Sequence, residues 1–143
     1  MAKNNQLIVR LAQEQFVAVR QVEMKWVDLS QFQFDYDLNW AAMFVNADDT
    51  VYAHYGNQSA ADADAYNSIA SVEKTMRRVL ALQKDYSNNK NGLAGKLGKP
   101  KPYKTALEMP GMKHRAKLSR STARNNCVQC HNIHDAVHEQ LYR

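Results

Sequence analysis

Residues 40–55 read WAAMFVNADDTVYAHY, and the architecture of the chain is built around this stretch. Two apolar runs, at 40–45 and 51–55, are rich in the aromatic and β-branched residues that favour strands. The segment between them includes Asn46 and Asp48, whose short polar side chains suit a tight reversal of the chain. The pattern predicts an antiparallel β-hairpin.

Helices are predicted on both sides of this hairpin. Residues 5–15 place apolar side chains on one helical face, and residues 16–20, FVAVR, form a short β-rich run behind them. After the hairpin, residues 61–86 follow a helical period, with Ser59 as the predicted N-cap. A mostly apolar stripe follows this second helix along Tyr66, Ile69, Ala70, Glu73, Met76, Val79 and Leu80. The predicted class is α/β, with helices flanking a small sheet.

Both cysteines of the chain lie in the motif Cys127-Val128-Gln129-Cys130-His131. This C-x-x-C-H spacing is the attachment motif of a c-type haem. About one turn of helix separates the two thiols, so both can add to the vinyl groups of one porphyrin while the adjacent imidazole ligates the iron. The motif predicts that Cys127 and Cys130 bind a covalent haem c, with His131 as the proximal iron ligand.

The order helix, strand, hairpin, helix matches the C-terminal half of a thioredoxin-like fold. The chain resembles a bacterial family of thioredoxin-like proteins at residues 27–40 (VDLSQFQFDYDLNW) and in parts of 46–56 (NADDTVY and YG). Some members of that family end in a C-x-x-C-H segment, and the resemblance covers roughly residues 5–85 and 127–135. It implies a truncated thioredoxin-like sheet with flanking helices, then a long basic loop and a short C-terminal haem-binding helix.

The chain departs from the wider thioredoxin pattern in two respects. No cysteine precedes residues 5–15, where thioredoxins have their redox pair, and no proline precedes the hairpin, where they have a cis-proline. Dithiol exchange at that site is excluded, so the fold is expected to be a redox-inactive scaffold. The first strand of such a fold would lie before Met1, and the sheet edge left exposed predicts an oligomer or further chain segments that cover it.

Zinc is a competing ligand for the same tail. Cys127, Cys130, His134 and His138 form a C-x2-C-x3-H-x3-H string of four suitable donors. The spacer between the cysteine pair and the histidine pair is much shorter than in the usual zinc finger, and His131 would have no role. Haem is favoured for these reasons, and zinc stays an alternative.

The sixth iron ligand is expected upstream of the motif. His134 and His138 follow His131 on one helix, so they stay on the proximal side of the haem. The upstream donors are, in order of preference, His114, His54 and either Met109 or Met112, with a vacant position as a further alternative. His114 is preferred because its flanking cations disfavour protonation and leave a neutral imidazole for iron. Each Met is equally suited to filling gaps in a core.

Basic residues concentrate in one segment of the chain. Residues 84–126 contain eleven Lys or Arg against two acidic residues. Recurring Asn, Gly and Pro predict a basic wrap or linker over 87–126, without helix or strand. Only Tyr86 and Tyr103 are available there to stack on bases, which disfavours nucleic acid. An acidic redox partner is expected, and a solvated face or a surround for haem propionates are the alternatives.

The composition indicates one modest globular domain. The chain has 143 residues, 45% of them hydrophobic, and a net charge of +5. No apolar run approaches the roughly 20 residues that span a bilayer. Residues 1–11 lack the features of an export signal. Because haem c is attached outside the cytoplasmic membrane, the expected location is periplasmic or extracellular, and the chain is expected to be a mature or truncated form.

The residues support three functional hypotheses. The first is a monohaem c-type cytochrome that carries single electrons, organised as residues 1–86, 87–126 and 127–143. The second is an interaction module whose tail binds zinc and whose basic loop docks an acidic partner. The third is a haem enzyme with an open iron position. Asp35 and Asp37 could form a carboxylate pair, but alternating exposure explains their spacing, and no catalytic residue is predicted.

Overall fold

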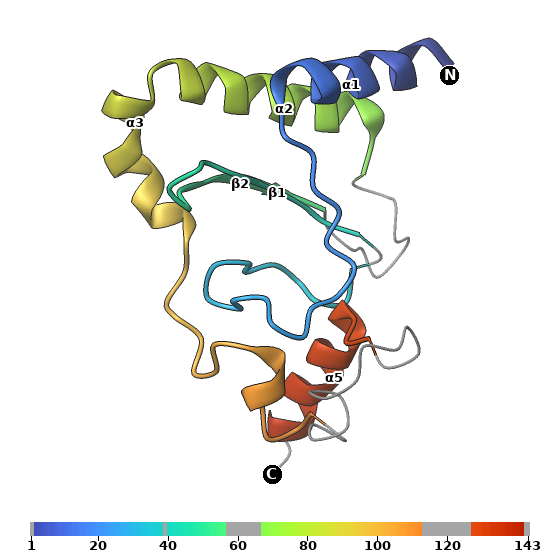
Figure 1. The fold of residues 1–143 in the computed structure, drawn as a ribbon, viewed down its shortest axis with the longest axis vertical. Coiled ribbons are helices and arrows are strands. Elements are labelled where there is room, and N and C mark those ends of the chain that lie inside the picture. Colours follow the sequence, from blue (N-terminus) through green and yellow to red (C-terminus); the bar gives the residue numbers. More distant parts are fainter. Residues whose placement is uncertain (1, 39, 57–66, 113–126, 142–143) are drawn as a thin grey trace. The chain divides into compact units, whose positions relative to one another are not determined.

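A computed structural model describes residues 2–38, 40–56, 67–112 and 127–141. This part of the chain contains helices and a two-stranded antiparallel sheet, so the mixed α and β class is confirmed (Figure 1). The chain divides into two compact units: unit 1 is Met1–Arg20 with Asn39–Lys96, and unit 2 is Gln21–Leu38 with Leu97–Arg143. Among the helices so described, none has the length and apolar character needed to cross a membrane.

Unit 1 contains the predicted hairpin. Strands β1 (Ala42–Val45) and β2 (Val51–Tyr55) pair antiparallel. The Asn46 N–H donates to the Thr50 carbonyl at 2.8 Å and closes the reversal between the strands. Asp49 adopts a positive φ of 66°, a left-handed conformation that Asp tolerates better than most residues. The turn predicted from the Asn and Asp residues is confirmed.

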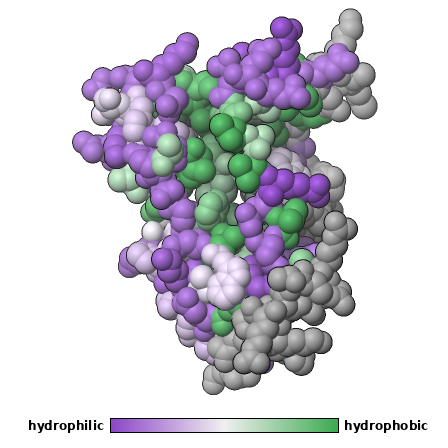
Figure 2. Space-filling view, viewed as in Figure 1, coloured by the Kyte–Doolittle hydropathy of each residue, from purple (hydrophilic) through white to green (hydrophobic). Residues whose placement is uncertain are grey.

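Two helices accompany the hairpin in unit 1. Helix α1 (Ala2–Gln15) packs against α2 (Ile69–Lys84), and α2 packs against β2 (Figure 1). Helix α2 buries Met76 and Val79, two members of the predicted apolar stripe. Figure 2 shows mainly hydrophilic side chains along the two helices and hydrophobic side chains over the hairpin. The amphipathic periods that predicted these helices therefore correspond to real packing faces.

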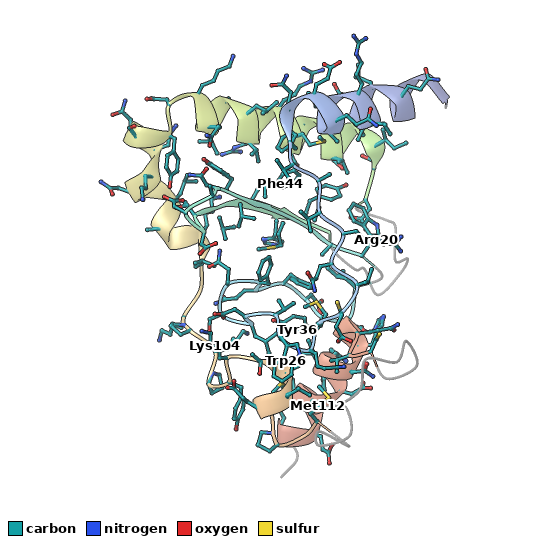
Figure 3. All side chains as sticks on the ribbon, in the orientation of Figure 1. Arg20, Trp26, Tyr36, Phe44, Lys104 and Met112 are labelled. Atoms are coloured by element: carbon teal, nitrogen blue, oxygen red, sulfur yellow. The ribbon has the colours of Figure 1, made fainter. Side chains whose placement is uncertain are left out.

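Aromatic side chains fill the core of unit 1. The rings of Phe16 and Phe44 meet edge to face with centroids 5.8 Å apart, and Phe44 is labelled in Figure 3. Tyr52 is buried with Val79 and Leu93, which connects the hairpin to both helical segments that follow it. Such aromatic contacts contribute about 0.5–1.5 kcal/mol beyond the area that they bury.

Two predictions for unit 1 are wrong. Residues 16–20 form no strand, and Val17 and Val19 are 94% and 81% exposed. A β-rich run needs a paired strand, and the sheet of the described residues consists of β1 and β2 alone. The helix predicted from residue 61 begins at Ile69, because the side chains of Ser68 and Ser71 each accept the other residue's backbone N–H as a capping box. The predicted N-cap, Ser59, lies outside the described residues.

The prediction of a basic wrap without helix is wrong for residues 87–96, whereas residues 97–105 and 109–112 form neither helix nor strand, as predicted. Residues Tyr86–Leu93 form helix α3, and Ala94–Lys96 continue as the 3-10 turn η1. The helix is stabilised by contacts that composition does not reveal: Leu93 is buried in the unit 1 core, and Lys90 pairs with Asp48 at 2.7 Å. Tertiary contacts thus override the weak helix propensity of its Asn and Gly residues.

Unit 2 packs irregular segments around helix α5 (Cys130–Leu141). The short 3-10 turn η2 (Ala106–Glu108) contributes the fully buried Ala106. The core comprises Met24, Leu29, Tyr36, Ala106, Met109, Met112, Val128, Ile133 and Ala136. Figure 3 shows Tyr36 and Met112 beside α5. The Leu29 N–H donates to the Lys104 carbonyl at 2.8 Å and joins the two segments that pack against the helix.

Candidate haem attachment site

The C-x-x-C-H motif lies at the amino end of helix α5. Cys127 and the two residues after it precede the helix, and Cys130 is its first residue. The helix predicted for the tail is therefore confirmed over Cys130–Leu141, but residues 127–129 form no helix, so the helical turn expected between the two thiols is not present. Val128 and Ile133 are 1% and 0% exposed and are the largest fully buried side chains of the described residues. Val128, one of the two residues between the cysteines, thus anchors the motif in the core of unit 2.

Residues 21–38 hold the motif through both backbone groups of Val128. The Val128 N–H donates to Oε1 of Glu23 at 2.9 Å, and the Val128 carbonyl accepts from the Met24 N–H, also at 2.9 Å. A buried backbone group left without a partner costs about 1–3 kcal/mol. These two bonds therefore fix the position of Val128, the residue that follows Cys127.

Glu23 also interacts with the first cysteine. Burial acts to raise the pKa of the Glu23 carboxyl, but hydrogen bonds from Val128, Lys25 and the Cys127 thiol, with the nearby Lys25 ammonium, outweigh it and lower that pKa. The Lys25 N–H donates to Oε1 at 3.0 Å, and Lys25 Nζ lies 3.4 Å from Oε2. Glu23 is therefore an ionised acceptor that holds the backbone beside the thiol of Cys127.

Neither cysteine forms a disulfide, and both are half-buried. Burial raises the pKa of the Cys130 thiol, and a backbone hydrogen bond opposes this effect only in part. A lowered pKa provides the nucleophilic thiolate of a reactive cysteine, and burial acts in the opposite direction on Cys130. Reduced, partly accessible thiols are the form that adds to haem vinyl groups.

His131 presents its imidazole at the surface. Its side chain is 51% exposed, and its Nδ1 lies 3.4 Å from Oδ1 of Asp37. The Asp37 carboxylate thus lies on the Nδ1 side of the ring, and Nε2 is the ring nitrogen that remains for a metal.

The donor set fits a covalent haem. Two reduced thiols and one imidazole are the groups that form the thioether bonds and the proximal ligand of haem c. Cys127, Cys130 and His131 are all partly exposed, whereas Val128 and Ile133 between and behind them are buried. The three side chains are therefore accessible from outside the core of unit 2.

The predicted distal ligands lie in different surroundings. Met109 and Met112 are buried in the core of unit 2, the gap-filling role that was their alternative. His54 is an exposed residue of β2 in unit 1, opposite Met43 in the hairpin register. His114 lies outside the described residues. The structure thus gives the two Met side chains a packing function and places His54 in the other unit.

The zinc string is not assembled into a site. His134 and His138 stack along α5 with ring centroids 4.3 Å apart, and His134 Nδ1 lies 3.8 Å from Asp135. Within the described part of the chain, no three His, Cys, Asp or Glu side chains form a group able to hold a metal ion. The two histidines therefore behave as partly exposed helix residues in this structure.

Sequence reasoning does not reveal the contacts of Glu23 and Asp37 with the motif. Glu23 is far from the motif in the chain, and no local pattern connects a lone carboxylate with the backbone of Val128. The alternating exposure predicted for Asp35 and Asp37 is confirmed, because Tyr36 between them is buried, but the position of Asp37 opposite His131 depends on the packing of unit 2. Both contacts arise from tertiary structure, so spacing along the chain carries no signal for them.

Comparison with known proteins leaves the site to be interpreted from its own residues. None of the protein-family models matches this chain, and neither a curated protein nor a solved structure shows significant similarity to it.

Proposed function

We propose that the protein is a monohaem c-type cytochrome that acts as a one-electron carrier. The observation that supports this function is the construction of the C-x-x-C-H segment. Val128 is locked into the core by its side chain and both backbone groups, while Cys127, Cys130 and His131 stay accessible around it. This arrangement holds Cys127, Cys130 and His131 in defined positions and leaves their side chains partly exposed.

Each residue of the segment has a definite task in this function. The haem iron supplies a one-electron couple between its ferric and ferrous states. Cys127 and Cys130 fix the group by thioether bonds, and His131 offers Nε2 as the proximal ligand. The core behind them keeps these positions constant, which limits reorganisation when the electron arrives or leaves.

The scaffold belongs to the same proposal. We infer that the scaffold is a redox-inactive, truncated thioredoxin-like fold. The order α1, β1, β2, α2 in unit 1 supports this inference. The strand expected at residues 16–20 is not formed, so the support rests on the hairpin and the two helices. Because the only cysteines belong to the haem motif, that motif is the redox centre of this chain.

His114 is the distal ligand that we favour. Drawing Met109 or Met112 out of the core would leave a cavity, and truncating a buried Met to Ala typically costs about 2–5 kcal/mol. This cost weighs against the two Met side chains as ligands. We expect His114→Ala to open the sixth position, so that carbon monoxide binds the reduced variant but leaves the spectrum of the reduced wild-type protein unchanged.

The location and the partner follow from the proposed cofactor and the charge. Attachment of haem c outside the cytoplasmic membrane implies a periplasmic or extracellular protein. The excess of Lys and Arg over residues 84–126 suits an acidic redox partner protein. Long-range attraction between opposite charges raises the rate of encounter, which a freely diffusing carrier requires.

Spectroelectrochemistry tests the carrier function. The protein is expressed with an added export signal beside the haem c maturation machinery and titrated while its visible spectrum is recorded. An electron carrier gives one reversible one-electron transition and does not bind carbon monoxide when reduced. Ready binding of carbon monoxide by the wild-type protein, with turnover of peroxide, would instead support a haem enzyme with an open iron position.

A further inference from the structure

The Asp37 carboxylate faces the ring nitrogen of His131 that iron ligation leaves unused. We propose that Asp37 is a positioning residue for the proximal ligand: it accepts the Nδ1–H of His131, orients Nε2 for the metal and makes the imidazole a stronger donor. This inference rests on the haem function proposed above. It assigns a role to a carboxylate that lies outside the attachment motif.

A tight turn and a buried ring hold Asp37 in place. The Asp37 N–H donates to Oδ1 of Asp35 at 3.1 Å, which shapes the turn between them. Tyr36 is buried in the unit 2 core, and its hydroxyl donates to the Phe32 carbonyl at 3.0 Å. The residue immediately before Asp37 is therefore fixed, and the carboxylate is presented from a defined backbone position.

Two pairs of consecutive residues face each other across this part of unit 2. Tyr36 belongs to the unit 2 core, and Cys130 packs against the same core. Asp37 and His131 are the next residue in each segment, and both are about half exposed. The two segments that carry Asp37 and His131 are therefore both anchored in one core.

The distance and the chemistry agree with a ligand-orienting contact. The separation of 3.4 Å from Nδ1 to Oδ1 is an ion-pair distance, and it exceeds a normal hydrogen bond by roughly 0.2 Å. Metal-binding histidines usually donate their second N–H to a carboxylate or carbonyl, which fixes the tautomer and raises the basicity of the ligand. A more basic ligand stabilises ferric over ferrous iron.

The test compares Asp37→Asn with Asp35→Asn in the haem-loaded full chain. Both variants remove one negative charge from the same turn, but only Asp37 faces His131. We expect Asp37→Asn to move the redox equilibrium about tenfold toward the reduced form, ~59 mV for one electron. The proton resonance of His131 Nδ1–H in the reduced protein should shift upfield in the same variant. Asp37→Glu, which restores the charge, should recover part of both effects.

The possible failures are distinguishable. Absence of covalent haem from the wild-type protein would overturn the proposed function and this inference together. Normal haem content in Asp37→Asn, with the potential and the Nδ1–H resonance of the wild type, would overturn the role of Asp37 and leave the haem function intact. Equal shifts of the potential in the Asp35→Asn and Asp37→Asn variants would show that only the net charge of the turn matters. That result would also overturn the positioning role of Asp37.

Discussion

Glu23 shows how one side chain can organise a motif far away in the sequence. Its carboxylate accepts the Val128 N–H and the Lys25 N–H, and it also interacts with the Cys127 thiol. Hydrogen bonds to a charged acceptor are stronger than neutral ones, so the charge itself contributes to the stability of unit 2. The attachment segment therefore depends on a residue outside the motif.

The variant Glu23→Gln tests this dependence through pH. The folded state lowers the pKa of Glu23 below its ordinary value of 4.5, so its stabilising effect is present above that pH and is lost as the pH falls through the lowered pKa. We expect the variant to lose about 1 kcal/mol of unfolding free energy at neutral pH. The difference from wild type should shrink toward zero in acid.

Urea unfolding followed by Trp26 fluorescence measures this difference. A Trp40→Phe background restricts the signal to unit 2, since these are the two tryptophans of the chain. Asp135→Ala, an 80% exposed side chain on α5, is the control and should change stability by less than about 0.5 kcal/mol. A Glu23→Gln deficit that stays constant from neutral to acid pH would show that the charge is not involved.

The elements of the fold differ in how far the sequence predicts them. The hairpin and the helices α1 and α5 were predictable, because their turn residues and apolar periods are local signals. Helix α3 was not, because its stability comes from Leu93 in the core and from the Lys90–Asp48 pair. Residues 16–20 show the converse case: their β propensity is high, but they form no strand.

Close packing of α5 depends on a glycine. A Cβ added to Gly111 would meet the backbone of Ala136, with the Ala136 Cα at 3.0 Å and its carbonyl carbon at 3.1 Å. Because helix backbone yields little, we expect Gly111→Ala to displace α5 and cost about 1–3 kcal/mol of unfolding free energy. Urea unfolding followed by Trp26 fluorescence in the Trp40→Phe background measures the loss.

Gly92→Ala in α3 is the matched control for that substitution. A Cβ at Gly92 would have no neighbour within 4 Å, so the better helix propensity of Ala should stabilise the protein by roughly 0.5–1 kcal/mol. Urea unfolding followed by circular dichroism measures this change. Loss of stability in both variants would indicate a general intolerance of Ala rather than tight packing at α5.

At the scale of the whole molecule, the two units interleave along the chain. Residues Gln21–Leu38 join unit 2, although they lie between segments of unit 1. The contacts of Val128 with Glu23 and Met24, and of His131 with Asp37, all arise from this interleaving. The motif alone predicts which residues would attach the haem. The residues that contact the motif could be identified only from the complete fold.

Charge on unit 2 should govern its exchange of electrons with small ions. Lys99, Lys101 and Lys104 are exposed in the same unit as the motif. We expect oxidation of the reduced protein by anionic ferricyanide to slow as ionic strength rises, because salt screens the attraction. The triple Lys→Gln variant should weaken that dependence, measured by stopped flow. A cationic cobalt oxidant is the control, and the same salt dependence with both oxidants would refute the electrostatic effect.

Covalent attachment of haem to Cys127 and Cys130 is decided by the mass of the denatured protein. After expression with an export signal and the haem c maturation machinery, the wild-type chain should be heavier than its apoprotein by one haem. The Cys127→Ser, Cys130→Ser double variant should show the apoprotein mass. An apoprotein mass for the wild type, with any haem colour lost on denaturation, would contradict the proposal that this chain is a c-type cytochrome.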